Sequence, residues 1–171
     1  MISEEISTKL ENLLKAKQLA ALVLGDHQNI QYATGVRIPV AAAQPDLIVL
    51  AVIRPGRQPV VIVPDAWVAV AAIHSYGAKV RGYGLETSPL EASVALMLRE
   101  VGNGTAIGVC SGSMSARLAA RIETSLPSAL RYRFIAQFPC SESSAAFILA
   151  QGNTIGLAAV STSSAGYRGD L

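Results

Sequence analysis

Short apolar runs alternate with amphipathic helical segments along most of this chain, and this alternation limits the fold more than any other feature. The first segment is an apolar stripe at steps of three and four residues, formed by Ile6, Leu10, Leu13 and Leu14. Charged residues fill the positions between them, so the pattern predicts an amphipathic helix. Residues 20–24 follow as a short apolar run closed by Gly25 and Asp26, which predicts a buried strand and its turn.

The same alternation continues through the rest of the chain. Residues 46–53 and 59–63 predict an antiparallel hairpin, and Asp65 is the expected cap of a helix over 66–74. The remaining predicted elements are a strand at 79–83, a helix at 88–101 that starts at Ser88 and Pro89, a strand at 105–110, a helix capped by Ser113 or Ser115 that ends at Pro127, a strand at 131–135, and a last helix from Ser141. Together they predict an α/β fold, with a mixed sheet covered by helices on both faces.

The composition suggests that part of the surface is covered by something else. The chain is 51% hydrophobic and 15% charged, whereas an average domain has roughly 25% charged residues. A dimer interface or a neighbouring domain would explain the excess, and so would the abundance of alanine alone.

Charge and cysteine content exclude several classes of protein. The net charge of +2 is too balanced to indicate a nucleic-acid partner. Arg131 and Arg133 form the densest basic pair, and a solvated strand face explains them. The apolar runs are too short for a membrane span, and we expect no secretory signal peptide. Cys110 and Cys140 do not form a disulfide framework, so we expect a cytoplasmic location.

The segment after the first strand carries a resemblance to a known family. Residues 29–35 read Asn-Ile-Gln-Tyr-Ala-Thr-Gly, and this motif, placed after a helix and a strand, resembles the amino-terminal domain of the creatinase/prolidase/aminopeptidase P family. Ala33 and Val36 stand where that family commonly has Leu and Phe. The order of elements up to about residue 150 supports the resemblance more than the motif does.

The resemblance implies a fold, a domain division and a parent enzyme. It implies a ribonuclease H-like amino-terminal domain over residues 1–140, and a helix and tail over 141–171 that lead toward an absent catalytic domain. The junction at residues 140–146 matches the family poorly. The parent would be a metal-dependent hydrolase of Xaa-Pro peptides, or a creatinase-like amidinohydrolase. It would hold two divalent metal ions (Mn, Co or Zn) in the catalytic domain, whereas this chain would hold none and would not be catalytic itself.

The resemblance also indicates which residues face a partner. In dimeric relatives the region that corresponds to residues 36–45 faces the other subunit, so Tyr32, Arg37 and Pro39 are candidates for a substrate-facing or dimer loop. The guanidinium of Arg37 could pair with a substrate carboxylate, or it could simply face solvent. Structural roles are the alternative for the motif, with Asn29 capping a helical turn and Tyr32 packing on the sheet. We therefore expect a homodimer, and a covalently linked catalytic domain in the parent.

The turn at residues 110–115 supports two other hypotheses. Ser111, Gly112 and Ser113 could present free amides to an anion at the start of a helix, which would make the chain a stand-alone small-molecule or anion-binding module. Cys110 sits in a Gly-x-Cys-x-Gly pattern that is also typical of a nucleophile elbow. The alternatives are an ordinary capping turn and a buried structural cysteine.

Overall fold

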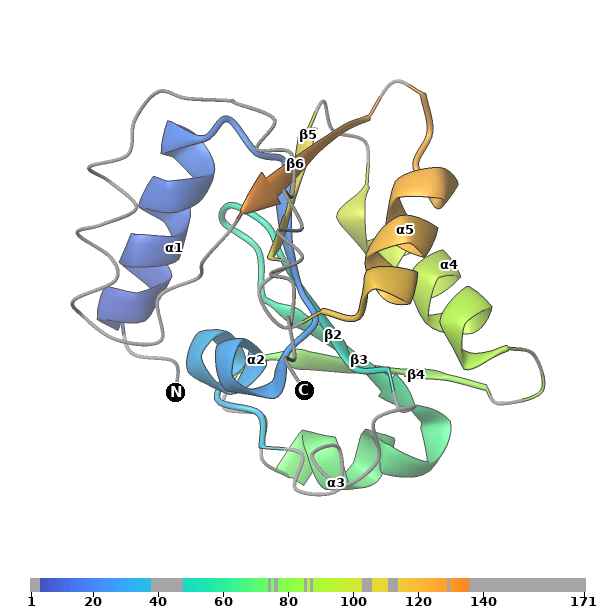
Figure 1. The fold of residues 1–171 in the computed structure, drawn as a ribbon. Helices are drawn as coiled ribbons and strands as arrows, with labels where there is room; N and C mark the ends of the chain where they lie inside the picture. The colour runs from blue at the N-terminus through green and yellow to red at the C-terminus, as the bar shows by residue number, and fades with distance from the viewer. Residues whose placement is uncertain are drawn as a thin grey trace, which may run out of the picture.

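A six-stranded mixed sheet forms the centre of the molecule (Figure 1). The computed structural model describes residues 4–37, 48–73, 75, 77–84, 86, 88–102, 106–110, 114–128 and 130–135, with only the backbone at positions 132 and 134. The strands are β1 (Ala21–Leu24), β2 (Leu50–Ile53), β3 (Val60–Pro64), β4 (Lys79–Tyr83), β5 (Ala106–Cys110) and β6 (Arg131–Ile135). Their order across the sheet is β4-β3-β2-β1-β5-β6. β2 runs antiparallel to both of its neighbours, and the other pairs are parallel.

Helices cover both faces of this sheet. One face packs against α1 (Glu4–Ala16), α2 (His27–Thr34) and the segment formed by the 3-10 turn η2 (Asp65–Trp67) and α3 (Val68–Ile73). The other face packs against α4 (Pro89–Val101) and α5 (Ala116–Ser125), which lie together on the right of Figure 1. The fold is therefore the mixed α/β arrangement that the sequence predicts.

The four residues of strand β1 are aliphatic and buried on both faces of the sheet. Leu22 and Leu24 pack with α1 and α2, whereas Ala21 and Val23 pack toward α4 and α5. All four residues have no exposed surface. A strand between two helical layers must be apolar on both faces, which explains its continuous run of aliphatic side chains.

Several predicted boundaries are confirmed, and one predicted cap is wrong. The hairpin of β2 and β3 forms, Pro89 opens α4, and Ser115 caps α5 by accepting a hydrogen bond from the Leu118 amide at 3.2 Å. Asp65 does not cap a helix before residue 66, because it is itself the first residue of η2. Its carboxylate lies instead against Gly82 of β4.

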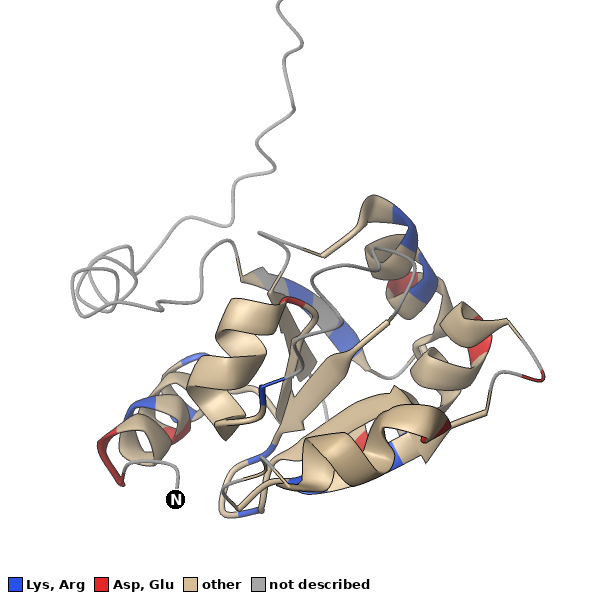
Figure 2. Cartoon of the chain, turned by 90° about the horizontal axis from the view of Figure 1, so that it is seen from below, with Lys and Arg blue, Asp and Glu red and all other residues tan. Residues whose placement is uncertain are grey.

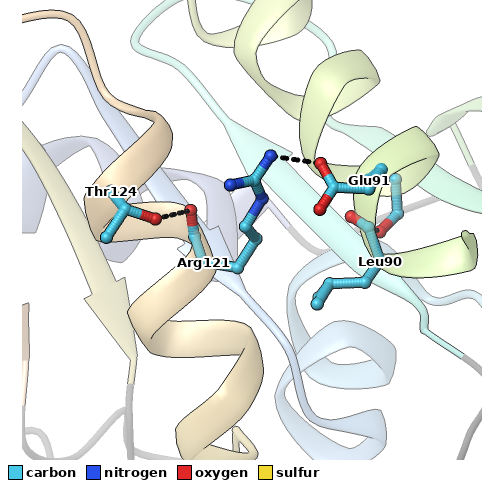
Figure 3. A network of polar contacts seen from close by, with 5 residues as sticks. Leu90, Glu91, Arg121 and Thr124 are labelled. Carbon is cyan, nitrogen blue, oxygen red and sulfur yellow. Dashed lines mark hydrogen bonds and ion pairs between the residues drawn. The ribbon is translucent and has the colours of Figure 1, made fainter.

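The two helices on the second face are joined by an ion pair. Arg121 of α5 points toward Glu91 near the start of α4, and its guanidinium donates a hydrogen bond to the carboxylate (Figure 3). Both side chains are substantially exposed, so the pair contributes less than about 1 kcal/mol. The buried contacts of Val94, Met97, Leu118 and Ile122 therefore hold α4 and α5 on the sheet.

Candidate functional site

The carboxyl ends of β1 and β5 meet at the centre of the sheet. These strands are parallel neighbours, yet the chain leaves β1 toward α2 on one face and leaves β5 toward α5 on the other. Open α/β sheets commonly bind ligands outside the strand ends where such a divergence occurs. Cys110 ends β5 at this point, whereas residues 111–113 of the candidate turn lie outside the described residues.

The residues that follow β1 secure α2 against β5. Asp26 is the N-cap of α2, and its carboxylate accepts hydrogen bonds from the Asn29 amide nitrogen at 2.7 Å and from the Asn29 side chain. The side-chain amide of Asn29 also donates, through Nδ2, to the Cys110 sulfur at 3.6 Å. Asn29 is therefore not the cap that the sequence suggested. It is the capped residue, and it links α2 to the end of β5.

The side chain of Cys110 is buried, and its backbone is part of the regular sheet pairing. It is 1% exposed, and its backbone pairs with Ile135 of β6 in the sheet. A nucleophile elbow needs a side chain raised into solvent on a strained turn. The burial and regular pairing of Cys110 support the structural reading instead of the nucleophile.

Met114 packs over the turn that follows β1. A methyl group at Gly25 would lie 2.5 Å from Met114 Cε, so the end of the Met114 side chain would have to move to admit a larger residue there. Met114 therefore fills part of the space outside the strand ends. Ser111, Gly112 and Ser113 lie outside the described residues, so the anion turn stays a prediction.

The motif at residues 29–35 has an architectural role in this fold. Ile30 is 1% exposed in the core, and Thr34 Oγ1 donates to the Ile30 carbonyl oxygen at 2.5 Å. The same hydroxyl accepts a hydrogen bond from the Val36 amide at 3.2 Å. Gly35 ends α2 with a φ of 72°, which a side chain would disfavour. The roles of Asp26 and Thr34 were missed in the sequence, although an Asp before a helix and a Gly after it are ordinary boundary signals.

The candidate loop residues occupy different environments. Tyr32 lies on α2 and packs, partly buried, against the core beneath α1 and α2, which agrees with a structural role. Arg37 is exposed and follows the buried Val36. Pro39 and most of the loop 36–45 lie outside the described residues, as do His74 and the segment from residue 136 onward.

Helix α3 presents an apolar stripe to solvent. Val70 and Ile73 are 50% and 77% exposed, the large exposed hydrophobic residues of the described chain. Ala66 of the preceding turn η2 and Ala69 of α3 are also exposed, at positions four residues before Val70 and Ile73, so the four side chains follow one side of this segment. The helix is at the bottom of Figure 1 and carries no charged residue in Figure 2. We call these four residues the α3 stripe.

The expectation of a solvated face for Arg131 and Arg133 is wrong for Arg133, whose side chain is partly buried. Its guanidinium donates to the Lys17 carbonyl oxygen just beyond α1 at 2.7 Å, and the contact is partly buried. A cation at this place interacts favourably with the carboxyl end of the helix. Arg131 is exposed, as expected.

The described ranges hold neither a cluster of metal ligands nor a helix that could span a membrane. They contain no group of three or more His, Cys, Asp or Glu side chains that could hold a metal ion. The ligands present in this part of the chain therefore do not fit a two-metal site, which needs several converging oxygen and imidazole donors. Among the helices that the structure describes, none is both long enough and apolar enough to cross a bilayer.

Comparison with solved structures identifies similar folds. The N-terminal domain of an X-Pro dipeptidase from Streptococcus pyogenes matches with a TM-score of 0.59 and 18% identity, covering 77% of this chain and 92% of that one. A proline dipeptidase from Streptococcus agalactiae matches with a TM-score of 0.61 and 14% identity over 78% and 95%. The prolidase of Pyrococcus horikoshii matches with a TM-score of 0.57 and 14% identity, over 77% of this chain but only 33% of its own.

Comparison with sequences gives one clear assignment. A search of curated proteins gave no match. The model of the creatinase/prolidase N-terminal domain matches residues 7–137, which is most of the chain and includes every described strand. The chain therefore belongs to the creatinase/prolidase N-terminal domain family.

Proposed function

We propose that this chain works as the non-catalytic amino-terminal domain of an Xaa-Pro metallopeptidase, where it serves dimerisation and shapes access to the partner subunit's catalytic cleft. The observation that carries the proposal is the family match over residues 7–137, together with the likeness to one third of the Pyrococcus horikoshii prolidase chain. In this proposal a linked catalytic domain holds the two divalent ions and performs hydrolysis. A cytoplasmic location belongs to the same proposal.

The proposed dimer needs an apolar surface that is exposed in the isolated subunit. The α3 stripe provides such a surface, because it places two large aliphatic side chains in water on a helix that itself carries no charged residue. A stable interface uses roughly 20–30 residues from each partner, so α3 can supply only part of it. The loop 36–45, with Tyr32, Arg37 and Pro39, is the other proposed contributor.

A matched pair of substitutions tests the association. Ala69→Glu introduces a carboxylate into the α3 stripe, whereas Ala95→Glu introduces the same group on the exposed side of α4. Burying an unpaired carboxylate is costly. We therefore expect Ala69→Glu to weaken the dimer by more than about tenfold while Ala95→Glu leaves it unchanged.

Sedimentation equilibrium over micromolar concentrations measures both variants and the wild type. A dimer weakened only by Ala69→Glu supports the proposal. A wild type that is monomeric throughout this range contradicts self-association, and an equal response to the two substitutions contradicts the assignment of the interface to α3.

A second candidate function is a small-molecule or anion-binding module at the turn 110–115. The divergence of the chain after the parallel strands β1 and β5, the second of which ends at Cys110, favours it. Its test is a titration with inorganic phosphate at constant ionic strength, followed by thermal unfolding. A saturable rise in Tm supports binding, and an unchanged Tm up to millimolar phosphate rejects it.

A further inference from the structure

Positive charge gathers where α4 ends, on the edge of the sheet formed by β4. Five basic side chains come from the end of β2, the following turn, β4 and the last turn of α4: Arg54, Arg57, Lys79, Arg81 and Arg99. Among the described residues of these segments, Glu100 is the acidic one. The local excess is four positive charges, although the whole chain has a net charge of only +2. We call these five residues the α4-end basic cluster.

The sheet register brings three members of the cluster to one face. Lys79 pairs with Val60 and Arg81 with Ile62, and both lie at even steps from the buried Tyr83, which packs toward α4. Arg54 follows β2 two residues after Val52, whose side chain also faces α4. Residues two apart on a strand share a face, so these cations lie on the α4 side of the sheet.

Glu100 holds two of the arginines in place. Arg81 Nε donates to Glu100 Oε1 at 3.3 Å, and Arg54 Nη2 lies 3.9 Å from Glu100 Oε2. The Glu100 side chain is only 15% exposed, so the two guanidinium groups are anchored around a nearly buried carboxylate. Arg54 Nη1 also approaches Gly102, at the negative end of the α4 dipole. An anchored guanidinium loses less freedom on binding than a free one.

One carboxylate and one helix end do not neutralise five cations. Arg57, Lys79 and Arg99 are exposed, and Arg81 keeps 46% of its side chain in solvent. Four of the five are arginines, whose planar groups bind carboxylate and phosphate in bidentate geometry. The described segments of the cluster expose no aromatic side chain on which a base could stack, which disfavours a single-stranded nucleic acid.

We propose that the α4-end basic cluster is a docking surface for a carboxylate-rich protein segment. Arg57, Lys79 and Arg99 make direct contacts with acidic side chains of the partner, and Glu100 positions Arg54 and Arg81 beside them. The whole chain has a net charge of only +2, which favours a short acidic segment over a nucleic-acid duplex. This binding does not depend on the proposed dimer or on the parent enzyme.

The test measures binding of a fluorescein-labelled decaglutamate peptide to the full chain by anisotropy at low ionic strength. Arg57→Gln combined with Arg99→Gln removes two exposed cations that do not contact Glu100. Arg117→Gln combined with Arg131→Gln removes two exposed cations elsewhere, so the two double variants have the same net charge. We expect the first variant to weaken binding by about tenfold and the second by less than about twofold.

Three results would overturn the proposal. The first is no binding of the peptide by the wild type, and the second is an equal loss in the two variants, which would mean non-specific attraction. The third is tighter binding of a fluorescein-labelled oligothymidylate of equal charge, which would assign the surface to nucleic acid. A circular dichroism spectrum and a Tm close to those of the wild type show that each variant is folded.

Discussion

Tyr83 is a buried hydroxyl whose ionisation the fold opposes. The residue is 4% exposed at the end of β4, and its hydroxyl donates to the Ile48 carbonyl oxygen at 2.9 Å. Burial disfavours the phenolate and raises the pKa of Tyr83 to about 12, against 10.0 for an ordinary tyrosine. The folded state therefore keeps a proton that the unfolded chain releases.

The sign of this shift gives a prediction for alkaline unfolding. The stabilising effect of neutral Tyr83 is complete below pH 10 and is lost as the pH rises toward 12, because the unfolded state then binds fewer protons. The free energy of unfolding should fall over this window, with Tyr83 contributing at most about 1.4 kcal/mol per pH unit. Urea unfolding from pH 8 to 12 measures the slope.

Tyr83→Phe should be less stable than the wild type at pH 8, by about 1 kcal/mol, but its stability should be less sensitive to alkali. Equal slopes for the two proteins would contradict this origin.

At the scale of elements, η2 can pack closely against β4 because residue 82 of β4 is a glycine. Gly82 lies beneath Asp65, so a methyl group at this position would overlap with Asp65 Oδ1 and lie 2.7 Å from Val68 Cγ2. Val68 is β-branched and cannot easily move away. The glycine in β4 therefore allows the η2–α3 segment to lie close to the sheet, which is also how α3 is held with its stripe facing outward.

Two alanine substitutions test this contact. Gly82→Ala should lower the free energy of unfolding by about 1–3 kcal/mol, because Asp65 and Val68 must shift. Gly84→Ala is the control, since its methyl group would lie 3.7 Å from Asp65 Oδ2, an ordinary contact distance. Denaturant unfolding of both variants gives the comparison. Similar losses at the two positions would show that the approach of η2 to β4 is not the cause.

The elements could be predicted where their patterns are local. The stripe of α1, the hairpin of β2 and β3, and the Ser88–Pro89 start of α4 are set by neighbouring residues, and the structure confirms them. The eight-residue α2 was expected only as a helical turn, although Asp26 and Gly35 are local signals of its two ends.

Long-range contacts could not be predicted in the same way. The hydrogen bond from Asn29 to Cys110 joins residues 81 positions apart, and the one from Arg133 to Lys17 joins residues 116 apart. The position of Asp65 over Gly82 depends equally on the pairing of β3 with β4. No local pattern carries such information, because the sheet order decides which strand ends meet.

At the scale of the whole molecule, the described residues form a scaffold with two distinct exposed surfaces. The α3 stripe is apolar, and the α4-end basic cluster is positively charged around Glu100. Neither surface contains a set of converging metal ligands within the described ranges.

The most direct measurement is an assay of Xaa-Pro dipeptide cleavage by the purified chain, combined with elemental analysis of bound metal. With Mn, Co or Zn supplied, the proposal predicts no cleavage above the rate without protein and no stoichiometric metal after dialysis. An active prolidase in the same buffers confirms that the assay works. Cleavage proportional to the chain's concentration, with two tightly held ions per chain, would contradict the assignment of this chain as a non-catalytic domain.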